Sequence, residues 1–432
     1  MQFKQYPSYK NSGVEWLGDV PDEWDIYPFW YLFNRKEITN KTQEQLLSVY
    51  LDRGVILHSE GGGMVHKPAD NLEKYQLVEV NDFVMNNQQA WRGSVGVSPY
   101  RGIVSPAYLI FSFNKTLCEP KFFKYFLRDK GVVDQFMIAS MSVGTIQRQV
   151  KGHLLKTIQL SIPSLIEQNT IANFLDTETT RIDNLIAKQE KLIELLEEQR
   201  KSIISHAVTK GLNPDAPMKD SGVEWLGDVP EHWDVKSYRF VSKIYRGKFG
   251  HRPRNDPSLY DGEYPFIQTG DVARAGKYIQ TYSQTLNEKG KAVSQVFTSG
   301  TLVMAIAANI GDTAILNFEA YAPDSVVGFK PHKNIDLEFL RFSFIASLQA
   351  LEQTAVQSTQ ANLNVERIGA LKTTFPPLSE QIEISNYLNA ENEKNNHLIS
   401  KQNQLIEKLK EYRSSIISHA VTGKIDVREF VA

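Results

Sequence analysis

Two blocks of sequence that each occur twice, in the same order, constrain this chain more than any other feature. The ten residues Ser12-Gly-Val-Glu-Trp-Leu-Gly-Asp-Val-Pro21 recur unchanged 209 positions later, at 221–230, and a Trp-Asp pair follows each copy. A second block, 167–209, recurs at 380–422 with 24 of 43 positions identical. Because such self-similarity marks a repeated structural unit, the sequence predicts two halves of similar construction.

The stretches between the repeats, roughly 27–160 and 236–373, resemble each other far less. The repeats are alike, whereas the inserts between them differ. This contrast favours a symmetric frame that carries two segments with different recognition tasks. An ordinary duplication whose halves simply stack on each other is the alternative.

The 432 residues are long enough for several domains. In each insert, short β-like runs alternate with Gly, Pro and Asn (45–51, 82–86, 103–113, 264–268 and 326–330), and helical runs follow at 121–130 and 337–349. We therefore predict an α+β fold class with two globular mixed α/β domains. The predicted boundaries are 1–26 and 216–235 for the leading repeats, 27–162 and 236–375 for the inserts, and 163–215 and 376–432 for the helical blocks.

The helical blocks carry the pattern of a coiled coil. No Pro or Gly interrupts residues 167–208, and Pro163 and Gly211 flank the run. Apolar residues recur with a period of 3.5 along both blocks. In the first block they are Ile171, Leu175, Ile182, Leu185, Leu192, Leu196 and Ile203, and in the second Ile384, Leu388, Leu398, Leu405, Leu409 and Ile416.

Neither helix can bury its apolar stripe alone, so we predict that the two pair, antiparallel, with Gln189 facing Gln402 and setting the register. The same register brings Arg413 near Glu178 and Arg200 near Glu391. Separate burial of each helix within its own domain is the alternative.

The distribution of charge indicates where nucleic acid would bind. A net charge of −2 excludes a uniformly basic surface. Residues 235–255, however, hold seven cations and no acid: Lys236, Arg239, Lys243, Arg246, Lys248, Arg252 and Arg254. Unopposed cations bind phosphates through counterion release, so we predict DNA contacts for the last five; a solvated basic face is the alternative.

A second candidate surface is the amide-rich run Asn86-Asn-Gln-Gln-Ala-Trp-Arg-Gly93. Amide side chains can bond adenine bidentately and Arg can bond guanine, although such loops are also ordinary turns. The acid-free stretch 135–166 follows. The predicted DNA-binding residues from these regions are Gln88, Gln89, Trp91, Arg92, Gln147 and Arg148, with Gln360 at the position equivalent to Gln147.

Motifs for catalysis are missing from the sequence. Cys118 is the only cysteine, and there is no GxxxxGK[ST], HExxH or GxSxG run. The N-terminal ten residues lack a signal-peptide core, and no run of ~20 apolar residues could cross a membrane. We therefore expect a cytoplasmic, non-enzymatic protein that binds no metal or cofactor itself.

These residues carry a family resemblance over nearly the whole chain. The duplicated Gly-Val-Glu-Trp-Leu-Gly-Asp-Val-Pro run resembles a motif of type I restriction–modification specificity subunits. So does Pro-x-Leu-x-Glu-Gln-x-x-Ile, here Pro163 to Ile171 and Pro376 to Ile384. Ser358-Thr-Gln-Ala-Asn-Leu363 is similar to the family's segment ahead of that helix, from which Gly144-Thr-Ile-Gln147 departs slightly.

The resemblance implies two target-recognition domains that read the halves of a bipartite, asymmetric DNA sequence, with antiparallel helices setting the spacing. It also implies two methyltransferase subunits that use S-adenosylmethionine, and two restriction subunits that use ATP and Mg²⁺. Three alternatives stay open: a coiled-coil scaffold with paired protein-interaction domains, an enzyme whose site escapes motif searches, and a specificity subunit that serves methylation alone.

Overall fold

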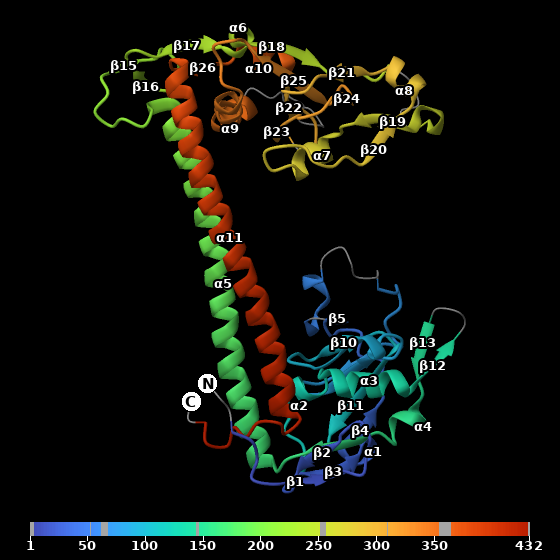
Figure 1. Cartoon of the computed structure of the whole chain (residues 1–432). Helices are drawn as coiled ribbons and strands as arrows, with labels where there is room; N and C mark the ends of the chain where they lie inside the picture. The colour runs from blue at the N-terminus through green and yellow to red at the C-terminus, as the bar shows by residue number, and fades with distance from the viewer. Residues whose placement is uncertain are drawn as a thin grey trace. The chain divides into compact units, whose positions relative to one another are not determined.

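The computed structural model of the chain describes residues 4–51, 53–61, 68–143, 147–250, 256–308, 310–353 and 364–430 (Figure 1). The chain divides into two compact units. The first comprises Met1–Gln189 and Gln404–Ala432, and the second comprises Glu190–Asn403. We call the insert 27–162 of the first unit domain 1, and the insert 236–375 of the second unit domain 2.

Both domains are built on a four-stranded antiparallel sheet with the same strand order, although their sequences differ. In domain 1 the order is β4-β11-β8-β9 and in domain 2 it is β18-β25-β22-β23. The strands of the first sheet are β4 (Phe33–Lys36), β11 (Tyr108–Phe113), β8 (Phe83–Asn86) and β9 (Val95–Val97), and those of the second are β18 (Ser242–Arg246), β25 (Val326–Pro331), β22 (Leu302–Ala305) and β23 (Thr313–Ile315).

Smaller elements around the sheet are also shared. Each half has a leading hairpin, a two-stranded ladder that joins the two ends of the insert, and several helices around the sheet. In the first half these are β1 (Tyr9–Asn11), β2 (Asp19–Pro21), β3 (Asp25–Pro28), β14 (Gln159–Ile162), α1 (Phe29–Leu32), α2 (Pro120–Phe126), α3 (Lys130–Ile138) and α4 (Gly152–Leu155). In the second half they are β15 (Met218–Asp220), β16 (Asp228–Pro230), β17 (Asp234–Ser237), β26 (Lys372–Phe375), α6 (Tyr238–Val241), α9 (Leu337–Gln353) and α10 (Val365–Ala370).

The domains differ in what is added to the shared sheet. Domain 1 adds three two-stranded pairs and short 3₁₀ turns: β5 (Leu47–Tyr50) with β6 (Gly54–Leu57), β7 (Gln76–Val78) with β10 (Gly102–Val104), β12 (Ser140–Val143) with β13 (Gln147–Val150), η1 (His58–Glu60) and η3 (Ala90–Arg92). Domain 2 adds a second sheet of order β20-β19-β24-β21 with short helices: β20 (Gln284–Leu286), β19 (Tyr260–Phe266), β24 (Ala320–Ala322), β21 (Gln295–Phe297), η4 (Pro257–Leu259), α7 (Thr269–Arg274) and α8 (Glu288–Ala292).

The predicted strands all fall on observed strands, but the run 103–113 is two strands, not one. It breaks at Pro106, which cannot donate to a ladder, and a turn in which Tyr108 N donates to Ser105 O (3.0 Å) separates β10 from β11. The mixed α/β fold class predicted for both inserts is confirmed.

The two repeated helical blocks form long, uninterrupted helices, as predicted. The first is α5 (Leu165–Lys210) and the second is α11 (Leu378–Val421). Each is followed by a glycine in the left-handed region, Gly211 (φ 80°) and Gly423 (φ 72°), which ends the helix without strain from a side chain. In the described parts of the chain, no helix has the length and apolarity needed to span a membrane.

In each unit the two helices run antiparallel. In the first unit, Arg413 near the end of α11 pairs with Asp183 in the first half of α5 (2.8 Å). In the second unit, Arg200 in the last part of α5 donates to Asn396 in the first half of α11 (3.2 Å). The seam residues Ile171, Leu175, Ile182, Ile384, Leu388 and Ile416 are buried, as predicted. Leu192 and Leu405, which were predicted to belong to the same stripe, are instead 39% and 41% exposed.

The polar partners along the helices lie five residues from the predicted ones, and Arg200 donates to Asn396 rather than contacting Glu391. Arg413 pairs with Asp183 rather than Glu178, whose carboxylate is held by Arg181 of its own helix (2.7 Å). Gln189 and Gln402 belong to different units, so their pairing stays a prediction.

Within each half, the two repeated motifs contact each other. The buried indole of Trp24 donates to Glu167 at the start of α5 (3.1 Å), and that of Trp233 donates to Glu380 at the start of α11 (3.0 Å). The next residue of the helix, Gln168 or Gln381, ties the helix to its domain. The amide of Gln168 bonds Leu117 O, Pro163 O and Glu119 N, and that of Gln381 bonds Asn334 O, Pro376 O and Asp336 N. These contacts explain why both motifs recur together.

Additional polar contacts around the two glutamates differ. Tyr6 donates to Glu167 (2.5 Å), and burial together with that carboxylate raises the pKa of Tyr6. His232 contacts Glu380 instead (2.9 Å). In the first unit the described segments near the N-terminus and the C-terminus pair beside this site, where Lys4 forms a β-bridge with Asp426 (Figure 1).

Candidate nucleic-acid interface

In domain 1 the structure brings together two groups of predicted residues that lie more than 50 positions apart in the sequence. The amide-rich run forms the loop between β8 and β9, and β13 passes beside it, with Val150 N donating to Asn87 O (3.1 Å). The guanidinium carbons of Arg92 and Arg148 both lie 5.7 Å from the centre of the Trp91 ring. Trp91 is thus flanked by two cations from different elements.

The backbone of this loop is fixed while its amide side chains are exposed. Asn86 Oδ1 accepts from Gln88 N (3.0 Å), and Gln88 O accepts from the Trp91 indole (2.9 Å). Gly93 (φ 93°) closes the turn. The side chains of Gln88, Gln89 and Arg92 are exposed, so they are available to a ligand without rearrangement of the loop.

Some predicted residues lie beyond what the structure describes. Arg252, Arg254 and Gln360 are outside the described residues. The backbone of Gln147 pairs with Val143 in the β12–β13 hairpin, but the side chain of Gln147 is outside the description. The DNA contacts predicted for these four residues stay predictions.

In domain 2 the cations of the segment 235–255 do not share one surface. Lys243 and Arg246 are exposed on β18, an edge strand, and their odd spacing places them on opposite faces of the sheet. Arg246 Nε donates to Asp324 O (2.6 Å), while Lys248 is exposed just beyond the strand. Arg239 is used to bond Gly369 O (3.2 Å). A basic surface on one side of the strand can therefore include Arg246 but not Lys243.

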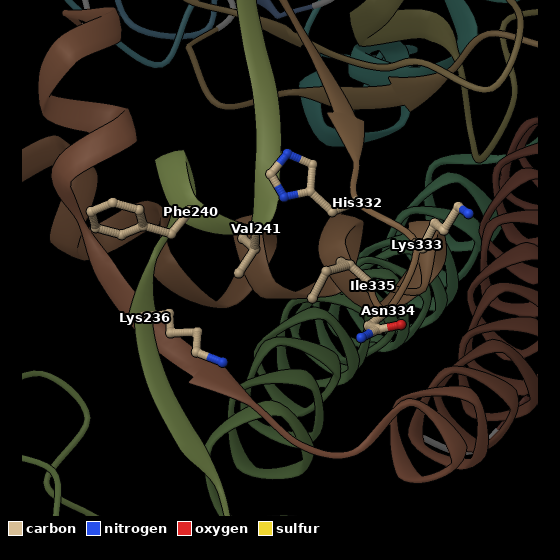
Figure 2. Close-up of a pocket in the computed structure, with 7 residues that line it drawn as sticks. All are labelled: Lys236, Phe240, Val241, His332, Lys333, Asn334 and Ile335. Atoms are coloured by element: carbon tan, nitrogen blue, oxygen red, sulfur yellow. The ribbon is translucent and has the colours of Figure 1, made fainter.

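Lys236 belongs to yet another surface, a hollow of about 580 Å³ beside the second leading repeat. Figure 2 shows its lining side chains, which come from β17, α6 and the turn after β25: Lys236, Phe240, Val241, His332, Lys333, Asn334 and Ile335. Lys236 is paired with Asp234 (2.6 Å), and Phe240 is 69% exposed. The first unit has a hollow at the corresponding place, lined by Tyr27 where the second has Lys236.

The loop of domain 2 that corresponds to the amide-rich loop, between β22 and β23, has a different chemistry. Ile306 in this loop is buried, and Gly311 packs closely against Leu348 of α9. Asn309 is outside the described residues, and burial raises the pKa of Asp312. This loop is thus packed against the domain, unlike its counterpart.

The described residues contain no group of three or more His, Cys, Asp and Glu side chains that could hold a metal ion. The thiol of Cys118 is buried in the core of domain 1, and burial raises its pKa to about 12. A thiol in this state is a core side chain and not a nucleophile.

These features define a class of protein: a duplicated frame whose two halves present chemically different recognition surfaces on similar sheets. Residues 230–408 match the sequence model of the type I restriction modification DNA specificity domain. The putative type I restriction enzyme MjaX specificity subunit of Methanocaldococcus jannaschii is 23% identical over 99% of this chain and 99% of its own length. The EcoKI specificity subunit of Escherichia coli is 22% identical over 74% of this chain and 70% of its own length.

Solved structures show the same fold. A chain from a type I restriction–modification system superposes with a TM-score of 0.70 at 16% identity and covers 93% of this chain and 98% of its own length. The HsdS subunit from Thermoanaerobacter tengcongensis superposes with a TM-score of 0.55 at 17% identity, with coverages of 94% and 98%. Over nearly its whole length, the chain is thus similar to type I restriction–modification specificity subunits, and residues 230–408 carry the match to their DNA specificity domain.

Proposed function

We propose that this chain is the DNA sequence-specificity subunit of a type I restriction–modification complex, and that domain 1 and domain 2 each read one half of a bipartite, asymmetric target. The observation that carries this proposal is the cluster of domain 1 in which Arg92 and Arg148 flank Trp91 beside exposed Gln88 and Gln89. It combines, on one surface, the cations that phosphates need and the amide and guanidinium groups that base edges need.

In domain 1 the geometry favours direct reading of base edges. The hydrogen bonds of the loop fix its backbone and leave the side chains of Gln88 and Gln89 exposed, so the loop does not have to rearrange before they meet base edges. An amide can bond adenine bidentately and a guanidinium can bond guanine. The Trp91 ring limits the positions of both guanidinium groups, which orients them before DNA arrives.

In domain 2 the exposed cations near the end of β18, Arg246 and Lys248, are the proposed phosphate contacts. The bond from Arg246 Nε to Asp324 O leaves the terminal nitrogens of the guanidinium to face a phosphate. Lys243 lies on the other face of the strand, and we assign it no contact on this surface. Half-sites about one helical turn apart suit a rigid two-domain reader.

The chain itself is proposed to be non-catalytic and cytoplasmic. Two methyltransferase subunits that use S-adenosylmethionine and two restriction subunits that use ATP and Mg²⁺ would supply the chemistry. Support for paired partners comes from the duplication, since Trp24–Glu167 and Trp233–Glu380 build the same local structure twice. Gene neighbours that encode a methyltransferase alone would point to a methylation-only system.

The proposal is tested by measuring DNA affinity of the chain in complex with its methyltransferase over a range of salt concentrations. We expect tight binding to one duplex sequence and a steep fall in affinity with salt. A stable complex without salt-dependent DNA affinity would favour the scaffold alternative. The register of the helices is tested separately by Gln189→Cys with Gln402→Cys, for which we expect disulfide formation.

A further inference from the structure

The connection between α7 and β20, residues 274–284, is an exposed segment of domain 2 with the side chains of a DNA-reading surface (Figure 1). It belongs to the part that domain 2 adds to the shared sheet. No acidic residue occurs from 272 to 287, and this whole stretch is described. Amide, guanidinium and hydroxyl groups of this kind form hydrogen bonds with bases and with the DNA backbone. Its exposed side chains include Arg274, Tyr278, Gln280, Tyr282, Ser283 and Gln284.

A buried carboxylate holds the two ends of the segment together. The side chain of Asp271, in α7, is 0% exposed. It accepts from Arg274 Nη2 at one end of the segment (2.6 Å) and from Ser283 Oγ at the other (3.3 Å). Because one carboxylate binds both ends, the segment is a closed loop with a fixed base.

The middle of the segment is held by the shared sheet. Lys277 O accepts from Ile315 N (2.9 Å), and Ile279 N donates to Ile315 O (3.1 Å), while the side chain of Ile279 is fully buried. Ile315 belongs to β23, the strand that corresponds to β9 of domain 1, and β9 closely follows the amide-rich loop. Both surfaces therefore lie beside the same strand of the shared sheet.

The two cations of the segment are already paired. Arg274 is paired with Asp271, and Lys277 forms an ion pair with Glu338 of α9. Phosphates bind best to unopposed cations, so the segment is poorly suited to the DNA backbone as a whole. A guanidinium that a buried carboxylate orients still has N–H groups on its other nitrogens, and these suit bidentate recognition of guanine.

Gln280 is the side chain of the segment best placed to read a base. It follows Ile279, whose backbone is pinned to β23, and its amide is exposed and bonds no other described residue. An amide with a free donor and a free acceptor can bond adenine bidentately. Tyr278 and Tyr282, which are 38% and 42% exposed, lie two positions away on either side, and their hydroxyl groups suit phosphate or sugar.

The segment and the proposed phosphate contacts border one hollow of domain 2. Gln284, at the end of the segment, lines a hollow of about 450 Å³ together with Pro323 and Ser325. These two residues flank Asp324, whose carbonyl accepts from Arg246. The segment and Arg246 are thus separated by a single hollow, a distance that one bound duplex can span.

We propose that the segment 274–284 is the base-reading loop of domain 2, in which Gln280 and Arg274 bond base edges while Arg246 and Lys248 bond the backbone. The inference rests on the proposed function and deepens it, because it assigns base reading in domain 2 to one loop. A protein partner is the less favoured occupant, since the exposed positions between the two tyrosines are polar, whereas the core of a protein interface is apolar.

The test measures discrimination by the complex of the full chain with its methyltransferase, on a target sequence mapped beforehand. Each base pair of both half-sites is replaced in turn by another Watson–Crick pair, and the resulting loss of affinity is compared between variants. Gln280→Leu should reduce discrimination at one base pair of the domain 2 half-site, on the order of 5- to 150-fold. Arg274→Lys keeps the charge but loses the planar fork, and should have the same effect at a second base pair.

Gln349→Leu and Arg239→Lys are the matched controls, because both side chains are exposed on other elements of domain 2. They should leave discrimination unchanged, and none of the four variants should alter discrimination in the domain 1 half-site. The methyltransferase is the same in every complex, so its own contacts with DNA cancel in the comparison.

Unchanged discrimination in both segment variants, or an equal loss of affinity for all sequences, would overturn base reading by this loop and leave the proposed function standing. Loss of the methyltransferase from the complex, measured by size-exclusion chromatography, would assign the segment to the protein partner and overturn the inference as well. Absence of sequence-specific binding by the unmodified complex would instead remove the proposed function itself.

Discussion

Domain 1 and domain 2 share a four-stranded sheet with one strand order, yet the loop between the third and fourth strands is exposed in one and packed in the other. In domain 1 that loop presents Gln88, Gln89 and Arg92. In domain 2 the loop is packed: Ile306 is buried and Gly311 lies against Leu348. The difference shows that two sheets with the same strand order can present loops of different exposure and chemistry at the same place.

The largest expected effect is on the domain 1 cluster. Arg92→Ala with Arg148→Ala removes both cations beside Trp91. Each lost base or phosphate contact is worth about 1–3 kcal/mol, so affinity for the target should fall on the order of 5- to 150-fold per contact. Competition binding with half-site variants checks the result.

Discrimination should relax in the domain 1 half-site only. Arg53→Ala with Arg101→Ala in the same domain is the matched control, because these arginines lie outside the cluster. Equal relaxation in both half-sites would contradict separate reading by the two domains.

We also expect a substitution in one half to lower the free energy of unfolding of that half alone. Trp24→Phe and Trp233→Phe each remove the indole donor to a helix-opening glutamate, and each should cost about 2 kcal/mol because a charge-assisted bond to a partly or fully buried carboxylate is lost. The free energy of unfolding of each half is the quantity to measure.

Cys118 provides the readout for the first half alone, because its thiol is 3% exposed in the domain 1 core and its pKa is raised to about 12 by burial. The thiol should react with a maleimide only when that core opens. Trp24→Phe should lower the denaturant concentration at which labelling begins, and Trp233→Phe should leave it unchanged. The same shift from both variants would show that the halves unfold together.

The smallest expected effect concerns the cations of domain 2. Arg246→Glu with Lys248→Glu should weaken binding to all sequences alike and lower the slope of log affinity against log salt by about one per lost phosphate contact. Lys219→Glu with Lys372→Glu changes the charge equally at exposed positions away from β18 and should leave the slope nearly unchanged. If the slope is the same in both double variants, Arg246 and Lys248 are only a solvated face.

The sequence predicts the long helices well because their limits and their seam depend on local signals. Proline before α5, glycine after it and apolar residues every 3.5 positions need no knowledge of the rest of the fold. The positions of the strands were also predicted from local patterns. The shared strand order of the two domains was not predicted, since many combinations of Val, Ile, Leu and Phe fit the same buried strand positions.

The sequence predicted which residues belong to the candidate site, but not how those residues are arranged in space. The contact of Arg148 with Trp91 depends on how β13 passes the β8–β9 loop, which no local pattern encodes. The seven cations of 235–255 are close in sequence and were therefore treated as one surface. Successive side chains of a strand point to opposite faces of the sheet, however, so Lys243 and Arg246 are separated. The bonds of Trp24 to Glu167 and of Trp233 to Glu380 were also not predicted. The motif with the tryptophan and the motif with the glutamate recur together in both halves, and this joint recurrence could have indicated that they contact each other.

The most direct test of separate reading by the two domains is methylation mapping after a domain exchange. The chain is expressed with its neighbouring methyltransferase in a host without adenine methylation, and the modified adenines are mapped by sequencing. We expect a single bipartite motif that requires this chain. Replacement of residues 27–162 by the corresponding segment of another specificity subunit should change one half of the motif and leave the other half intact. A motif that changes in both halves, or no methylation from a stable complex, would contradict the account.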